Sequence, residues 1–292
     1  EATIQLGFEA LRQFRELSGL AISSPLLRRL PPWRRSVQRY KSKQARLLEI
    51  IESICRNKSA SRTTFCGHLL ATRERFDLSL EDVKGNAALA FLFAARSTAA
   101  VLANMLHYLS DNPQWQERVR NSSDAASGRQ LLRAVVSESL RLNPVVPFIV
   151  RIAERDCKIA GMNLSRGDQV MATGLLTHYR EANFPSAEKF DPTRFLDEKI
   201  SNHEFIPFGG GKTHCIGSGL VYSIATGFLK LVAAGYECER TSGSPEDDKF
   251  VFQGVLCARS NCHFRLVPRV DLTPSPASDQ KLFTDNRQLV SA

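Results

Sequence analysis

Cys-x-x-Cys pairs are absent from this chain of 292 residues. Its seven cysteines are an odd number and form no dense pattern. This excludes the disulfide framework of a small secreted domain and favours reduced thiols in an intracellular or cytosol-facing protein. Cys257, Cys262 and His263 lie close in sequence but lack the spacing of a zinc site, so no zinc is expected.

Long apolar runs are also lacking. No run of about twenty apolar residues, the length of a membrane-spanning helix, is found. No internal repeat and no nucleic-acid-reading motif occurs. The net charge of +9 is spread along the chain, so nucleic acid is not an expected partner.

A basic stretch does stand out near the N-terminus. Apolar and cationic residues alternate from Pro25 to Trp33, a pattern that fits either an anionic membrane surface or a solvated loop. The basic residues of this stretch are Arg28, Arg29, Arg34, Arg35, Arg39, Lys41 and Lys43.

Apolar spacing predicts several helices and few strands. The expected helices are Ile4 to Leu17, Val37 to Cys55, Leu80 to Leu109, Trp115 to Arg120, Gly128 to Leu142 and Leu220 to Ala234, with a proline-rich connection through Pro32. Short strands are expected around turns at Gly161 and Gly167, and in a hairpin within Phe250 to Val267.

The most informative stretch is Phe208-Gly-Gly-Gly-Lys-Thr-His-Cys215-Ile-Gly217. Its glycines let the backbone turn sharply and lie against a flat ligand. Cys215 precedes an apolar helical segment, and a thiolate at a helix start gains from the unpaired N–H groups there. These conditions suit an iron held through sulfur. A structural thiol in a glycine-rich loop is the alternative.

The same stretch contains Gly211-Lys212-Thr213, which resembles the end of a nucleotide-binding P-loop. That motif requires another glycine at position 206, which is Ile. The P-loop interpretation is therefore rejected.

The stretch closely resembles the haem-ligand loop of the cytochrome P-450 superfamily. The fixed positions of that loop are occupied here by Phe208, Gly211, Cys215 and Gly217. The resemblance implies haem b with the Cys215 thiolate as its axial ligand. It also implies that basic residues near Cys215, such as Lys212, face an acidic electron donor.

Glu138 and Arg141 share one helical face, flanked by leucines and valines. The pair could be a weak surface ion pair or a partly buried one. It resembles the family's K-helix signature, and Phe190-Asp-Pro-Thr-Arg194-Phe resembles the family's meander, with Thr193 in place of the usual Glu. The resemblance implies that Glu138, Arg141 and Arg194 form a structural network beneath the haem-binding loop.

Two further segments extend the resemblance. In the family, an arginine at the place of Arg151 meets a haem propionate; an ordinary exposed arginine is the alternative. Ala94-Ala95-Arg-Ser97-Thr98 resembles the I-helix motif over the distal haem face, in which Ala94 and Ala95 would lie beside the cofactor.

Thr98 matches the oxygen-handling threonine of that motif, while Ala95 replaces its glycine and Ser97 its acid. Serine can relay a proton but is a poor proton source. Oxygen activation would then be slower or use water, or the chemistry would use peroxide or be an isomerisation. Ordinary helix packing is the alternative for Thr98.

Substrate contacts are expected from apolar residues at two places, which favours a lipophilic substrate; plain strand packing is the alternative. The first place follows the K-helix and the second is the tip of the terminal hairpin. The residues are Val145, Val146 and Phe148, and Phe252 and Val255.

By resemblance, the fold is mainly α with small β-sheets, an α+β class. Residues 1–268 would be a partial, N-terminally truncated cytochrome P-450 domain, from the family's F helix to its terminal β-hairpin. Residues 269–292 are polar and expected to be a disordered tail. The apolar helix from Leu80 would lack partners, so poor solubility or weak haem retention is expected.

The implied function is a haem-thiolate monooxygenase that inserts one oxygen atom from O2 into a lipophilic molecule, with electrons from an NADPH reductase or a ferredoxin. A peroxide-using or isomerising haem-thiolate enzyme and a truncated, non-catalytic remnant are the alternatives. The implied location is intracellular, either membrane-associated and cytosol-facing or cytoplasmic.

Overall fold

The computed structural model describes residues 31–56, 64–122, 126–197, 200–242, 251–252, 256–257 and 263–269. The expected helix from Ile4 to Leu17, the expected contact Val255 and the tail after Arg269 lie outside the described residues, as do Arg28 and Arg29.

Helices make up most of the described chain, and the sheets are small, which confirms the α+β class. The helices are α3 (Pro31–Arg56), α4 (Phe65–Thr72), α5 (Leu80–Ser110), α6 (Pro113–Asn121), α7 (Ala126–Leu142), α8 (Gly174–His178), α9 (Arg194–Asp197) and α10 (Ser218–Gly235), with a 3-10 turn η2 (Gly211–Thr213).

The strands form antiparallel pairs of two. β1 (Phe148–Ile152) pairs with β4 (Gln169–Thr173), and β2 (Cys157–Ile159) pairs with β3 (Met162–Leu164). β5 (Tyr236–Ser242) pairs with β8 (His263–Pro268), and β6 (Val251–Phe252) pairs with β7 (Leu256–Cys257).

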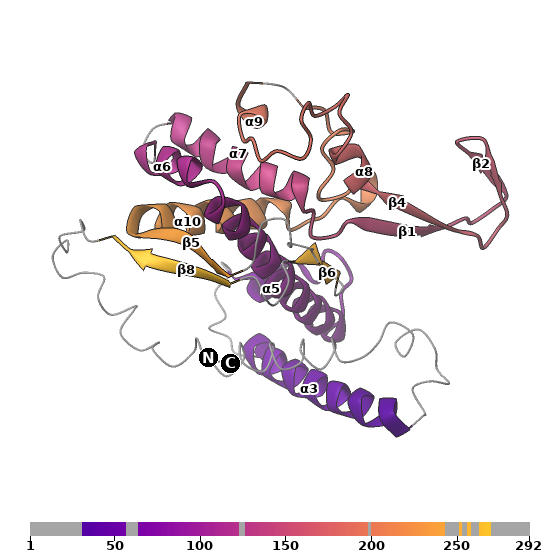
Figure 1. Cartoon of the computed structure of the whole chain (residues 1–292). Helices are drawn as coiled ribbons and strands as arrows, with labels where there is room; N and C mark the ends of the chain where they lie inside the picture. The colour runs from indigo at the N-terminus through magenta and orange to yellow at the C-terminus, as the bar shows by residue number, and fades with distance from the viewer. Residues whose placement is uncertain are drawn as a thin grey trace.

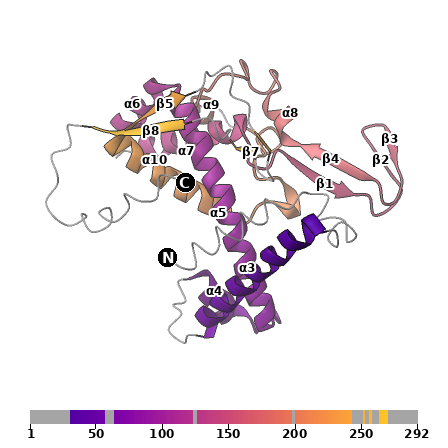
Figure 2. The ribbon, with the colours of Figure 1, turned by 60° about the horizontal axis from the view of Figure 1, so that its bottom comes forward.

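The longest helix, α5, runs through the centre of the molecule (Figure 1). A capping box starts it: Ser79 Oγ accepts a hydrogen bond from the Asp82 N–H, and the Asp82 carboxylate accepts one from the Ser79 N–H. α3 and α4 pack on its N-terminal part, as Figure 2 shows, and α6, α7 and α10 pack on its C-terminal part.

Two hydrophobic clusters therefore lie along α5. The smaller one joins α3 to α5 through Leu47, Ile51, Cys55, Val83, Ala87 and Ala88. The larger one joins α5, α6, α7 and α10, and its largest fully buried side chains are Met105, Leu109, Val119, Leu140 and Leu229. Each buried side chain of this size stabilises the fold by about 1.5–3 kcal/mol.

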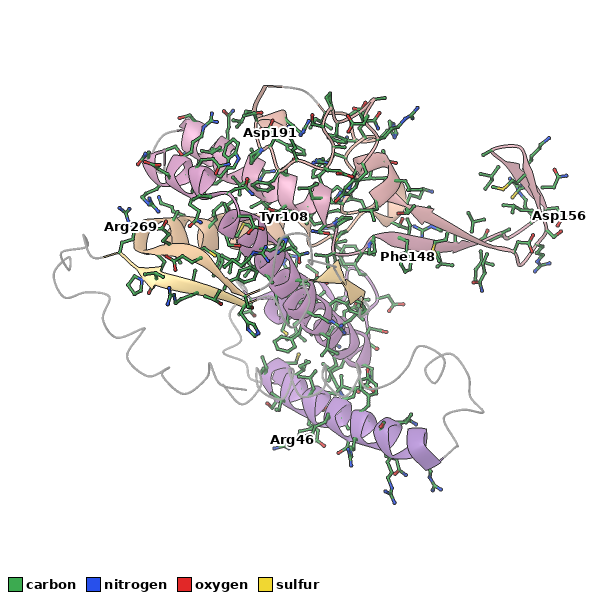
Figure 3. The ribbon with its side chains drawn as sticks, viewed as in Figure 1. Arg46, Tyr108, Phe148, Asp156, Asp191 and Arg269 are labelled. Atoms are coloured by element: carbon green, nitrogen blue, oxygen red, sulfur yellow. The ribbon has the colours of Figure 1, made fainter. Side chains whose placement is uncertain are left out.

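Tyr108 of α5 connects the larger cluster to the loops above α7. Its ring stacks on Phe190 with centroids 5.1 Å apart and planes 2° apart, and its hydroxyl is hydrogen-bonded to Asn143 Nδ2. Burial raises the pKa of Tyr108 well above its ordinary value, so the hydroxyl stays protonated. Figure 3 shows Tyr108 inside the body and Asp191 above it.

One expectation is corrected here. The proline-rich connection was expected to extend through Pro32, but α3 begins at Pro31, because proline is tolerated in the first turn of a helix. The exposed basic residues Arg34, Arg35, Arg39 and Lys41 consequently lie on a helix.

A second point concerns membrane-spanning length. α5 and α10 are both long and apolar enough to cross a membrane, by length and composition alone, although neither is an unbroken run of about twenty apolar residues. α5 is apolar on several sides because it packs against helices from both clusters. Leu89 and Phe93 nevertheless remain 55% and 65% exposed on it.

An arm, residues 148–173, projects from the body (Figures 1 and 2). The β1–β4 pair forms its shaft and the β2–β3 pair its tip, near Asp156 in Figure 3. The turns expected at Gly161 and Gly167 are present, with φ of 83° and 96°, a region in which a residue with a Cβ is strained.

Gln116 of α6 links the end of α5 to β5. Its Nε2 donates to the carbonyl oxygens of Leu109 and Cys238 at 2.8 and 2.9 Å, and its Oε1 accepts from the Cys238 N–H at 2.8 Å. All three bonds are buried, so they are not replaced by water when the side chain is removed.

We therefore expect Gln116→Leu to lower the free energy of unfolding by about 2–4 kcal/mol, because it leaves buried backbone groups unpaired. Gln114→Leu, at an exposed position on the same helix, is the control and should change it by about 0.5 kcal/mol or less. Urea unfolding of the three proteins measures the difference. Equal midpoints for the two variants would contradict this role of Gln116.

Candidate functional site

The Cys215 loop, residues 208–217, is closed by its own backbone. The Cys215 N–H donates to the Phe208 carbonyl at 3.0 Å, and the Cys215 carbonyl accepts from the Ser218 N–H at 3.3 Å. The Cys215 side chain is exposed, and Ile216 beside it is 96% exposed. The loop therefore holds the sulfur at the surface, immediately before α10 begins at Ser218.

Glycine is required at two positions of this loop. Gly209 and Gly211 have φ of 71° and 62°, which strain any residue with a Cβ. Gly217 differs, because a Cβ there would lie 3.7 Å from Cys215 Sγ, an ordinary contact. The positive φ values in the turn explain the glycines at 209 and 211, whereas crowding does not explain the glycine at 217.

The donor set fits haem better than a metal bound by protein ligands alone. Among the described residues, no group of three or more His, Cys, Asp or Glu side chains could hold a metal ion. A structural zinc site takes four such ligands, whereas haem iron brings four porphyrin nitrogens and needs only an axial ligand from the protein. One exposed sulfur meets that need.

Arg151 reaches this loop from the arm. It lies on β1, opposite Val170 of β4, and its Nη2 donates to Thr213 Oγ1 at 2.7 Å. The side chain is exposed. A strand and a loop that are 62 residues apart in sequence thus bring a guanidinium beside the loop that carries Cys215.

Glu138 and Arg141 form a fully buried ion pair on α7, with both side chains 0% exposed. Arg141 Nε donates to Glu138 Oε2 at 2.7 Å, and Arg141 Nη2 donates to Oε1 at 2.8 Å. The surface alternative is therefore excluded by the geometry. Arg194 completes the group, with its Nε 3.4 Å from Glu138 Oε1.

The remaining polar atoms of the pair tie α7 to the segment 178–194. Arg141 donates to the carbonyls of His178 and Lys189 at 2.8 and 3.2 Å, and Glu138 accepts from the Asp191 N–H at 2.9 Å. Buried charges need such partners to offset their desolvation.

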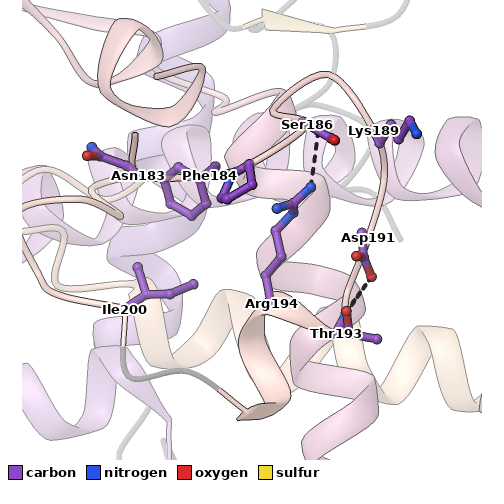
Figure 4. A pocket seen from close by; sticks show the side chains of 9 residues that line it. Asn183, Phe184, Ser186, Lys189, Asp191, Thr193, Arg194 and Ile200 are labelled. Carbon is purple, nitrogen blue, oxygen red and sulfur yellow. Dashed lines mark hydrogen bonds between the residues drawn. The ribbon is translucent and has the colours of Figure 1, made fainter. Parts of the chain in front are cut away.

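A pocket of about 450 Å³ lies beside Arg194. Figure 4 shows the Arg194 guanidinium pointing to Ser186, whose carbonyl accepts from Nη2 at 3.1 Å. Thr193, in place of the glutamate expected from the resemblance, bonds instead to Asp191, from its N–H at 3.0 Å and its hydroxyl at 2.6 Å.

His178 is a site residue that the sequence reasoning missed. It is fully buried, its Nδ1 lies 3.0 Å from the Arg141 carbonyl, and its Nε2 accepts from the Ile206 N–H at 3.0 Å. The pKa of His178 is lowered from the usual 6.5 to about 4, mainly by burial; the hydrogen bond to the Arg141 carbonyl raises it and the Arg141 charge adds to the lowering. No sequence pattern marks it, since its partners are 37 and 28 residues away.

The I-helix-like residues lie on α5. Thr98 is buried, Ala95 and Ser97 are partly buried, and Ala94 is exposed. Thr98 is followed within three residues by Ala100 and Val101 of the larger cluster.

The expected substrate contacts differ in their surroundings. Val145 is buried in the larger cluster, which fits the packing alternative. Val146 is 49% exposed and Phe148 is partly buried at the base of the arm. Phe252 pairs with Leu256 between β6 and β7, and Val255 lies outside the described residues.

A protein-family model described as Cytochrome P450 matches residues 14–264, most of the chain. The chain belongs to the cytochrome P450 family. The match covers the Cys215 loop, the Glu138–Arg141 pair and the whole of α5.

Curated relatives agree at low identity. The chain is 27% identical over 248 residues to a cytochrome P450 135A1 of Mycobacterium tuberculosis, covering 84% of this chain and 55% of the relative. It is 28% identical over 299 residues to a cytochrome P450 28c1 of Drosophila melanogaster (90% and 59%). It is also 28% identical over 229 residues to a cyclooctat-9-en-7-ol 5-monooxygenase of Streptomyces melanosporofaciens (71% and 50%). The chain thus spans about half the length of the curated relatives it matches.

We expect Glu138→Gln to lower the free energy of unfolding by about 3–5 kcal/mol, because it leaves the buried Arg141 charge uncompensated. Arg46 and Glu49 of α3 form an ion pair with the same i,i+3 spacing, but with side chains 66% and 63% exposed, and Figure 3 shows Arg46 pointing away from the body. Glu49→Gln should therefore cost about 0.5 kcal/mol or less. Urea unfolding checks both, and similar losses in the two variants would contradict the expectation.

His178 also predicts a pH dependence. Between pH 6.5 and about 4 the unfolded chain binds a proton at His178 that the folded chain does not bind. The free energy of unfolding should therefore fall as the pH is lowered through this range, by about 3 kcal/mol from this group. The free energy of unfolding is measured against pH for the parent and for His178→Gln, and the difference between the two curves gives the contribution of His178. The exposed His203→Gln is the control, and a parent curve that parallels that of His178→Gln would refute the prediction.

Proposed function

We propose that this chain is the haem-binding part of a cytochrome P450 monooxygenase, with the Cys215 sulfur as the axial ligand of iron in haem b. The observation that supports the proposal most is the exposed sulfur at the end of a closed glycine loop, in a chain of this family. Haem, when bound, would supply the activation of O2 and the insertion of one oxygen atom into a substrate.

Each protein group would then have a distinct task. Cys215 would bind as a thiolate, favoured by the N-terminal end of α10. Phe208, Gly211 and Gly217 would shape the loop against the macrocycle. Arg151, held beside Thr213, would pair with a propionate.

On the other side, Ala94 and Ala95 would leave room beside the ligand, because their side chains are small. The Thr98 hydroxyl would hold and pass a proton, and Ser97 would relay one. Neither hydroxyl is an acid, so the proton would come from water.

The substrate would be a lipophilic small molecule. Val146 and Phe148 leave apolar surface at the start of the arm, and Phe252 lies in the short hairpin near the end of the described chain. One relative is named as a monooxygenase of the alcohol cyclooctat-9-en-7-ol.

The electron donor would be an acidic protein, an NADPH reductase or a ferredoxin. A pocket of about 510 Å³ between α7 and α10 is lined by Arg129, Arg133 and Lys230, and the exposed Lys212 lies on the Cys215 loop. Cations grouped in this way steer acidic partners. We place the protein inside the cell, in the cytoplasm or on a cytosol-facing membrane surface that the basic residues of α3 would contact.

A second candidate is a peroxide-using or isomerising haem-thiolate enzyme, favoured by Ser97 at the place of the acid. Turnover with NADPH plus reductase, compared with turnover by hydroperoxide, separates the two. Failure of the chain to bind haem would contradict both.

The proposal predicts that the haem-loaded chain, reduced and treated with CO, shows the red-shifted Soret band of a thiolate ligand. Cys215→Ser should lose that band, because serine supplies no thiolate. Cys157→Ser, at a partly buried cysteine on the arm, is the control and should keep it. A red-shifted band that persists in Cys215→Ser would overturn the assignment of the ligand.

A further inference from the structure

His178 makes one hydrogen bond to each of two different parts of the site. Its Nδ1 faces the Arg141 carbonyl, which can only accept, so Nδ1 carries the proton. Its Nε2 faces the Ile206 N–H, which can only donate, so Nε2 is the acceptor. A single neutral tautomer satisfies both partners, and the low pKa of His178 agrees with that form.

The imidazole has little freedom to leave this position. Arg141 Nη1 donates to the His178 carbonyl at 2.8 Å, so the two residues bond to each other in both directions. The rings of Phe184 and Phe205 pack against the imidazole with centroids 6.5 and 5.6 Å away. Through Arg141, the position of the imidazole is tied to the buried ion pair with Glu138.

Ile206 leads directly into the Cys215 loop. Its carbonyl accepts from the Gly209 N–H at 3.1 Å, which starts the turn, and the Phe208 carbonyl then accepts from the Cys215 N–H at 3.0 Å. Pro207 has no N–H, so the Ile206 amide is the last backbone donor before Phe208. Ile206 also lies close to the start of α8, since a Cβ on Gly174 would be 3.0 Å from Ile206 Cγ1.

We propose that His178 is a positioning residue that sets the entry of the Cys215 loop, and with it the direction of the sulfur, by accepting the Ile206 N–H. It acts through Ile206 and does not touch Cys215. The inference deepens the proposed function, on which it rests only in taking Cys215 as the iron ligand. If His178 only stabilised the fold, losing either of its two hydrogen bonds would have the same effect on the loop. If His178 positions the loop, only the loss of the bond from the Ile206 N–H should change the loop.

Two amide variants separate the bonds. In His178→Asn the amide nitrogen takes the place of Nδ1 and keeps the bond to Arg141. In His178→Gln the amide oxygen takes the place of Nε2 and keeps the bond from Ile206. Each variant loses one hydrogen bond, so urea unfolding should show similar losses for the two.

The readouts are taken on the full chain without haem. They are the hydrogen-exchange rate of the Ile206 amide and the rate of Cys215 alkylation by iodoacetamide, with Cys157 of the same chain as the internal reference. For His178→Gln we expect both rates to stay within about twofold of the parent's. For His178→Asn we expect the Ile206 amide to exchange about tenfold faster, and the Cys215 alkylation rate to change by about fivefold. Haem added afterwards should give the parent's Soret band with His178→Gln and a shifted or weaker band with His178→Asn.

Equal changes in the two variants, or no change in either, would overturn the proposal. The parent gives an independent check that needs no variant to fold. If its Ile206 amide exchanges as fast as an exposed amide, His178 does not hold it and the proposal fails. Because these readouts need no haem, a parent that binds none would overturn the proposed function while the positioning role of His178 is still decided by the exchange and alkylation rates.

Discussion

The buried ion pair between Glu138 and Arg141 is the constraint on which the rest of the site depends. Two charges with no solvent contact are stable only when their remaining donors and acceptors are bonded. Those partners are backbone groups of residues 178, 189 and 191. Satisfying the pair therefore wraps the 178–194 segment around α7.

That wrapping determines where the sulfur lies. His178 is the first residue of the 178–194 segment, and its Nε2 accepts a hydrogen bond from the N–H of Ile206, which precedes the Cys215 loop. The loop then closes on itself through Phe208 and Cys215 and leads into α10, which packs against α7 in the larger cluster. The ion pair, the loop and the helix after it thus form one connected structure, and the sulfur lies on its exposed surface.

Local signals in the sequence predicted much of this. The spacing of Glu138 and Arg141, the apolar length of α5 and the glycines before Cys215 each depend on neighbours within a few residues. The start of α3 was misplaced because prolines end most helices but are tolerated in the first turn. His178 could not be found, since its bonds join residues far apart in sequence.

The proposed function requires that the Cys215 sulfur hold iron. The most direct test is X-ray absorption at the iron edge of the haem-loaded chain. We expect one sulfur scatterer in the first coordination shell, absent from the Cys215→Ser protein. A shell of nitrogen and oxygen only in the parent would contradict iron ligation by Cys215.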